Sequence, residues 1–318
     1  MRSPVDRRRT ARLRNVITSS AAKGKSRGIS VRHFLLILVG LVGLWSVALG
    51  AEPIRIVAAE NFYGDVAAQV GGGHVAVSSI LSNPDTDPHL FEASPSTARS
   101  IADANIVITN GAGYDAWMDG LVSATTAPAR TVLSVAELVG ARPGANPHLW
   151  YQPATLPAVA AALAAELERR DPANAADYRA RLAAFESSFA SAVTDVATIR
   201  AAHDGLTVTA TEPVFSYMAT AMGFAMLNEP FQLAVMNGTE PGPSLVAGFE
   251  ESLHSGTAKI LFYNSQVTDD TTARLLYIAK ANNIPVVGIT ETMPEGQTVQ
   301  SWLASEIAAV RAALGDAP

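Results

Sequence analysis

Short apolar runs alternate with helix-type segments along most of the chain after residue 53. The apolar runs predict strands at 54–58, 75–81, 106–109 and 131–133, and again at 206–210, 259–263 and 284–289. Helices are expected at 61–70, 95–104 and 114–123, and later at 214–222, 244–255, 271–282 and 302–314. Alternation of strands and helices is typical of βα units, so we expect largely parallel sheets.

Residues 153–202 interrupt this alternation. An Ala- and Leu-rich helix is predicted at 154–170, and Asp171-Pro172 ends it and starts another. Seven apolar side chains then recur at spacings of four and three: Tyr178, Leu182, Phe185, Phe189, Val193, Val196 and Ile199. This stripe predicts a helix of roughly 30 residues, about 45 Å long at about 1.5 Å per residue.

The predicted fold class is therefore α/β, with two lobes and one connecting element. Each lobe should hold a parallel-type sheet flanked by helices, the first at 51–170 and the second at 204–318. The long helix at 171–203 should join them as a rigid strut.

The N-terminal segment is predicted to be a signal peptide at 1–50. Residues 1–33 carry ten Lys or Arg and one acid, and an uncharged apolar run of 17 residues follows at 34–50, ending in small residues. A positive start, an apolar middle and small residues at the exit are typical of secretion signals. An uncleaved membrane anchor is the alternative, since 17 residues is near the lower limit for a bilayer span. We expect the mature protein in the periplasm.

Cysteine is absent from the 318 residues. This excludes disulfides, Cys-bound zinc or iron–sulfur sites and thiol nucleophiles, and it predicts a protein that is not lipid-anchored. After residue 33 the chain has 13 basic and 28 acidic side chains, a balance of −15. Such an acidic body argues against nucleic acid as a partner and favours cations. Motifs for a serine nucleophile, a phosphate loop, a dinucleotide turn or an H-E-x-x-H zinc site do not occur.

Two histidines share an unusual local pattern. His89 and His148 each follow a proline and precede apolar residues, in DPHLFE and NPHLW. Either one alone could be an ordinary half-buried histidine. As a pair at the ends of βα units in one lobe, they are better explained as metal ligands. The other histidines of the mature chain are expected at the surface: His74, His203 and His254.

Two glutamates of the second lobe occupy matching positions. Glu212 follows the strand predicted at 206–210, and Glu291 follows the last predicted strand. Glu212 could instead be a helix-capping residue. Ligands in open α/β sheets bind outside the carboxyl ends of the strands, so both acids are predicted to face one crevice.

Several motifs in a fixed order carry a family resemblance. They are DPHLFEASPST, ADANIVITNGAGYDAW, NPHLWYQP, TEPVFSYMATAMGF and PVVGITET. Over residues 53–315 the chain resembles the metal-binding lipoprotein and zinc/manganese-uptake group of ABC-transporter solute-binding proteins. The resemblance implies two α/β lobes bridged by a long helix, with one metal ion between them.

The resemblance also implies a set of ligands. The two family histidines fall on His89 and His148, and the third position falls on Glu212, which is histidine in many zinc-binding members and glutamate in manganese-type members. The fourth falls on Glu291, where aspartate is usual. The His-rich loop of many zinc-binding members is missing.

Two neutral imidazoles and two carboxylates would neutralise one Mn²⁺, Zn²⁺ or Fe²⁺ ion. The second carboxylate hardens the site and could bind through both oxygens, so we favour manganese, ahead of zinc and ferrous iron. The resemblance implies delivery to an ABC permease and its ATPase. We expect a monomer that is not an enzyme.

Three alternatives stay open on the sequence. The same fold could bind an organic or chelated-metal ligand of the siderophore or cobalamin type, although its arginines are scattered. The same four residues could serve a metal-dependent hydrolase, although four protein ligands leave little room for a reacting water. An adhesin role is neither supported nor excluded.

Overall fold

The computed structural model describes residues 52–83, 91–125, 127–142, 144–267 and 269–316. From Glu52 onward these residues form one compact unit. Its first lobe holds a parallel sheet in the order β2-β1-β3-β4. The strands are β1 (Ile54–Glu60), β2 (Val75–Leu81), β3 (Ile106–Thr109) and β4 (Thr131–Ser134).

The second lobe repeats this topology. Its parallel sheet has the order β6-β5-β7-β8. The strands are β5 (Thr207–Ala210), β6 (Ala225–Leu227), β7 (Leu261–Asn264) and β8 (Val286–Ile289). The seven predicted strands are confirmed, whereas the three-residue edge strand β6 was not predicted.

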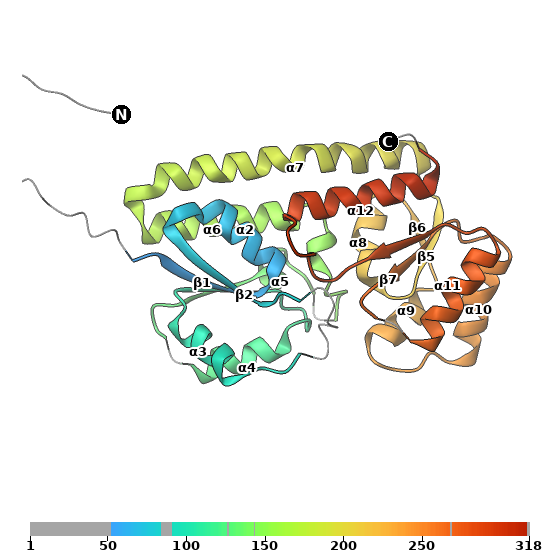
Figure 1. The fold of residues 1–318 in the computed structure, drawn as a ribbon, viewed down its shortest axis with the longest axis horizontal. Helices are drawn as coiled ribbons and strands as arrows, with labels where there is room; N and C mark the ends of the chain where they lie inside the picture. The colour runs from blue at the N-terminus through green and yellow to red at the C-terminus, as the bar shows by residue number, and fades with distance from the viewer. Residues whose placement is uncertain (1–51, 84–90, 126, 143, 268, 317–318) are drawn as a thin grey trace, which may run out of the picture. The chain divides into compact units, whose positions relative to one another are not determined.

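Helices cover both faces of each sheet (Figure 1). In the first lobe they are α2 (Asn61–Gly71), α3 (Pro95–Asp103), α4 (Ala116–Ala124), α5 (Val135–Leu138) and α6 (Thr155–Arg170). In the second they are α8 (Ser216–Ala221), α9 (Glu229–Met236), α10 (Pro243–His254), α11 (Asp270–Ala281) and α12 (Val299–Leu314). Coverage on both faces explains the continuous apolar strands: in β1, Ile56 and Ala58 join one core while Val57 and Ala59 join another.

A single helix of 29 residues, α7 (Ala175–His203), lies between the two lobes in sequence. It packs against α6 and α2 of the first lobe and against α8 and α12 of the second. Figure 1 shows it alongside α12. The predicted long helix is confirmed, but one member of its apolar stripe is exposed: Val193 is 52% exposed, beside Phe189 at 5%.

The main hydrophobic core runs through both lobes. It contains Ile56 of β1 and Phe262 of β7, together with side chains of α7 and α12. Aromatic rings connect its two halves: Tyr151 lies 5.6 Å from Trp302 and 5.1 Å from Phe215, measured between ring centroids.

A row of polar side chains on α2 adds hydrogen bonds between the lobes. Asn61 exchanges two hydrogen bonds with the backbone of Met293, at 2.6 and 3.0 Å. One turn later, Asp65 accepts from the backbone of Val299 at the start of α12. The segment that follows β8 is thereby attached to the first lobe as well as to its own sheet.

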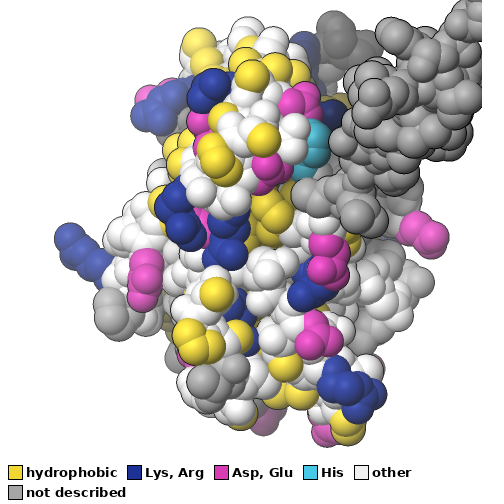
Figure 2. Space-filling view, turned by 90° about the vertical axis from the view of Figure 1, so that its left-hand side faces the viewer, with side chains coloured by type: hydrophobic (Ala, Val, Ile, Leu, Met, Phe, Trp, Pro, Cys, Tyr) yellow, Lys and Arg dark blue, Asp and Glu magenta, His cyan; other side chains and the backbone are white. Residues whose placement is uncertain are grey.

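No helix in the described part of the chain is long and apolar enough to cross a membrane. The apolar run at 34–50 lies outside the described residues. On the face drawn in Figure 2, basic and acidic side chains are interspersed rather than gathered by sign. The acidic balance of the mature chain therefore forms no single patch on this face.

Candidate metal centre

Three polar side chains lie at the carboxyl ends of neighbouring strands in the second lobe. Glu212 follows β5, Asn264 is the last residue of β7, and Glu291 follows β8. In the order β6-β5-β7-β8 the chain reverses direction across the sheet between β5 and β7. This is the type of position where open parallel sheets bind ligands.

His148 of the first lobe contacts this edge. Its Nε2 lies 3.3 Å from Oε2 of Glu291, and the two side chains are 1% and 0% exposed. Among the described residues, Nε2 has no hydrogen-bond partner. Both atoms are hydrogen-bond acceptors, so burying them face to face is unfavourable unless a positive charge compensates them. A proton on one of them, or a metal ion bound by both, would supply that charge.

The orientation of His148 is fixed by Asn146. The Asn146 amide group donates to the carbonyl of Pro213 at 2.6 Å, so its Oδ1 faces the histidine. Nδ1 of His148, 2.6 Å from that oxygen, must donate to it. The neutral ring then presents the lone pair of Nε2 toward Glu291, as in histidines that bind metals.

Replacing Asn146 by alanine should weaken metal binding without removing it. The imidazole would lose the partner that sets its tautomer, and such outer partners are worth about 10–100-fold in affinity. Competitive titration of metal-free protein measures the effect. Asn174→Ala is the matched control, because that amide bonds to Asp171 in the turn before α7. Equal affinity in Asn146→Ala and the control would contradict this role.

The two carboxylates of the second lobe share one amide. Nδ2 of Asn264 donates to Oε2 of Glu212 at 2.7 Å and to Oε1 of Glu291 at 2.5 Å. Gln266 holds the backbone of the same segment, since its Oε1 accepts from the N–H groups of Glu291 and Thr292. Neither amide was singled out from the sequence. An amide residue at the end of a strand was the only available signal.

Aromatic rings form the wall on the first-lobe side. Tyr114 and Trp150 lie 5.9 and 5.3 Å from the His148 ring, between centroids. Burial, and then the charge of the nearby Glu291 carboxylate, raises the pKa of Tyr114 well above its usual value. This wall excludes water from the contact between His148 and Glu291.

Two acids lie next to this wall, inside the first lobe. Burial raises the pKa of Asp115 to about 6, although backbone N–H groups of Gly111 and Asn110 bind its carboxylate. Burial, and then the charge of Asp115, raises the pKa of Glu60 well above its usual value. Neither acid was predicted as a site residue.

The structure brings together three of the four predicted ligands through the contacts given above. His148 touches Glu291, and Asn264 links Glu291 to Glu212. His89 lies outside the described residues. Within the described ranges, no three His, Asp or Glu side chains form a metal-binding group by themselves.

The remaining histidines are engaged elsewhere. Nε2 of His74 lies 3.0 Å from Asp177, and Nε2 of His203 lies 3.1 Å from Asp316. His254 contacts Asn282 through Nδ1, at 3.3 Å. None of these three is among the contacts described for the candidate centre.

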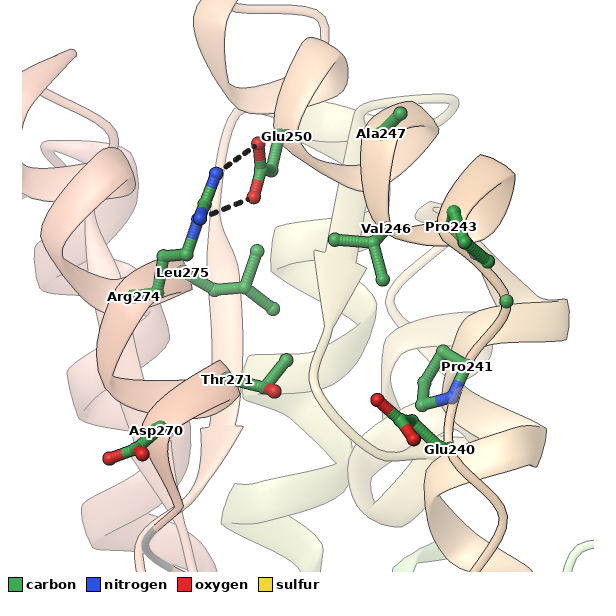
Figure 3. Close-up of a pocket in the computed structure, with 11 residues that line it drawn as sticks. Glu240, Pro241, Pro243, Val246, Ala247, Glu250, Asp270, Thr271, Arg274 and Leu275 are labelled. Atoms are coloured by element: carbon green, nitrogen blue, oxygen red, sulfur yellow. Dashed lines mark hydrogen bonds and ion pairs between the residues drawn. The ribbon is translucent and has the colours of Figure 1, made fainter.

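A hollow of about 750 Å³ lies between α10 and α11 (Figure 3). Arg274 binds Glu250 there through two contacts, of 2.7 and 3.0 Å. Glu240 and Asp270 lie on opposite sides of the opening (Figure 3). None of the described residues lining it is a histidine, and they form no metal-binding group. The candidate centre therefore stays at the strand ends.

The donor types at the strand ends suit a divalent transition metal. An imidazole with a fixed tautomer and carboxylates are ligands that manganese, zinc and ferrous iron share. Residues 56–313 match the model of the family described as ZnuA, the periplasmic component A of the zinc-uptake complex. The chain belongs to this family.

Members of the ZnuA family and related proteins share sequence with much of the chain. The manganese-binding lipoprotein MntA of Halalkalibacterium halodurans is 26% identical over 54% of this chain and 59% of its own length. This chain thus spans about three fifths of that relative. The metal ABC transporter substrate-binding lipoprotein ScbA of Streptococcus cristatus is 23% identical over 86% of this chain and 94% of its own length.

The periplasmic zinc-binding protein TroA of Treponema pallidum has a similar solved structure. Its TM-score is 0.70 at 18% identity, covering 83% of this chain and 99% of TroA. The predicted family and the two-lobed α/β fold are confirmed. Relatives of this ZnuA-family chain are named for manganese, zinc or iron.

The predicted absence of a lipid anchor is wrong. Both curated relatives described above are named lipoproteins. The prediction came from the missing cysteine, which bears on one chemistry of attachment only, the thioether-linked lipid. It does not support a general statement about how a member of the ZnuA family is held at a membrane.

Proposed function

We propose that this protein captures one divalent transition metal in the periplasm and delivers it to an ABC permease and its ATPase. The observation that carries the proposal is the buried contact between Nε2 of His148 and Oε2 of Glu291, 3.3 Å apart. A metal ion bound by both would satisfy the nitrogen lone pair and neutralise the carboxylate.

The proposed ligands are His89, His148, Glu212 and Glu291. Two neutral imidazoles and two carboxylates cancel the charge of one 2+ ion, so the loaded centre is neutral and its burial costs little. The first lobe, at 51–170, contributes the histidines, and the second, at 204–318, contributes the acids. Residues 1–50 serve as the export signal.

We infer that the protein is a carrier and not an enzyme. Its cargo is enclosed by protein ligands and aromatic side chains, and a metal-dependent hydrolase needs an open coordination position with a base beside it. The protein acts as a monomer and binds no nucleic acid, in line with an acidic mature chain.

The test is metal content followed by competition. Full-length protein exported to the periplasm should contain about one equivalent of metal by inductively coupled plasma mass spectrometry. Metal-free protein should then bind Mn²⁺ and Zn²⁺ competitively at one site, without turnover on ester or phosphoester substrates. Failure to bind any metal stoichiometrically, or turnover that depends on the metal, would overturn the carrier proposal.

A further inference from the structure

Asn264 lies between the two carboxylates of the candidate centre. It ends β7, the strand between β5 and β8, and its side chain is 2% exposed. The neighbouring strands lead into Glu212 on one side and Glu291 on the other. The sheet order therefore places this amide where the two acids converge.

The orientation of the amide is determined by its other end. Oδ1 of Asn264 accepts a hydrogen bond from the backbone N–H of Gln266 at 3.0 Å. The NH₂ group must then face the carboxylates, and it has one hydrogen for each. The NH₂ group donates one hydrogen bond to Oε2 of Glu212, at 2.7 Å, and one to Oε1 of Glu291, at 2.5 Å.

These hydrogen bonds occupy one oxygen of each carboxylate. The other oxygen of Glu291, Oε2, is the one that lies 3.3 Å from Nε2 of His148. An oxygen that binds a cation becomes a poorer hydrogen-bond acceptor, and the cation repels the N–H dipole that points at the same oxygen. Binding through both oxygens of either acid would therefore weaken a buried hydrogen bond to a charged group. Weakening of such a bond is costly where no water can replace it.

We propose that Asn264 sets the choice of metal by holding Glu212 and Glu291 as one-oxygen donors. This rests on the proposed function. One oxygen from each acid keeps the number of protein donors low, as in the four-donor tetrahedral sites that zinc adopts. Two-oxygen binding by both acids would add two oxygen donors, in the direction of the six-donor sites that suit manganese. Asn264 thus shifts the centre toward zinc, against the manganese preference expected from the residue types alone.

The experiment compares wild type, Asn264→Ser and Asn264→Ala. Competitive titration of each metal-free protein gives the ratio of Zn²⁺ affinity to Mn²⁺ affinity. The ratio should fall by about tenfold or more in Asn264→Ala, the scale of losses when an outer partner of a ligand is removed. The serine hydroxyl retains one hydrogen-bond donor, so the affinity ratio of Asn264→Ser should lie between those of wild type and Asn264→Ala. X-ray absorption of the Mn²⁺-loaded proteins should show more oxygen neighbours in Asn264→Ala than in wild type.

Asn282→Ala is the control for a change of the same kind in the same lobe. Its amide donates to Ile278 within α11, and the affinity ratio should stay at the wild-type value. An unchanged ratio in a folded Asn264 variant that still binds metal would overturn this inference alone. If Asn264→Ala does not fold, the test is made with Asn264→Ser: a lower ratio of Zn²⁺ to Mn²⁺ affinity supports the inference, and an unchanged ratio overturns it. A wild type that binds no metal would instead overturn the proposed function, and this inference with it.

Discussion

Replacing His148 by alanine is expected to lower the affinity for Zn²⁺ and Mn²⁺ by more than about 100-fold, beyond the range of outer-partner losses. The variant removes the only described imidazole that touches Glu291. Competitive titration of metal-free protein measures the loss, and metal content after export provides a second readout. His148→Gln, with a side chain of more similar volume, separates loss of the ligand from loss of packing beside Trp150.

The controls for this prediction are the histidines outside the candidate centre. His74→Ala and His203→Ala each break one contact with an aspartate near an end of α7. Metal affinity should be unchanged in both. Wild-type affinity in a folded His148→Ala protein would remove this residue from the proposed ligand set and take away the observation on which the carrier proposal rests.

Replacing Glu306 by glutamine is expected to make the protein more stable in alkaline solution. Burial raises the pKa of Glu306 to about 8, although Tyr151, Trp302 and the Thr290 backbone donate to its Oε1. Between the ordinary glutamate pKa near 4.5 and about 8, the folded chain holds a proton that the unfolded chain releases. The free energy of unfolding therefore falls as pH rises through this window.

Glutamine keeps the accepting oxygen and has no charge, so the variant should lose this pH dependence. At pH 4 the two proteins should have equal stability, and at pH 9 the variant should be more stable by a few kcal/mol, at about 1.4 kcal/mol per pKa unit. Urea unfolding at several pH values measures both. Parallel stability curves for the two proteins from pH 4 to 9 would show that Glu306 ionises normally in the folded state.

Glu166 offers a control with the opposite sign. A hydrogen bond from Arg169, followed by one from Thr131, lowers the pKa of Glu166 to about 2. Its stabilisation is present above pH 4.5 and is lost as pH falls toward 2. Glu166→Gln should therefore reduce stability about equally at pH 6 and pH 9, and leave the slope between them unchanged.

Patterns along the chain predicted the elements and the acids of the centre, but not its geometry. Glu212 and Glu291 could be found because each follows a strand of a parallel sheet, and strand ends meet at one edge. Asn264 also lies at a strand end, but an amide there does not by itself indicate a partner of a metal ligand, and Asn146 lies at no strand end. Their roles depend on which backbone carbonyl or carboxylate the fold brings opposite them, and this depends on the order of the strands in the sheet.

Two further differences have the same origin. The stripe that predicted α7 included Val193, which is exposed although Phe189 and Val196 on either side of it in the stripe are buried. The short elements β6 and α9 were missed because three to eight residues show too little periodicity to identify. Both the exposure of a side chain on a helix and the formation of a short element depend on which parts of the fold pack against them. The local sequence does not show these tertiary contacts.

The aromatic and aliphatic core that runs from β1 to β7 also determines how the protein unfolds. A chain with two sheets would ordinarily be expected to melt in two steps, and each half to survive on its own. Here each half contributes one side of a shared interior, together with the rings of Tyr151, Phe215 and Trp302. The two halves should therefore unfold together in one cooperative transition. Neither half should be expressible as a stable fragment.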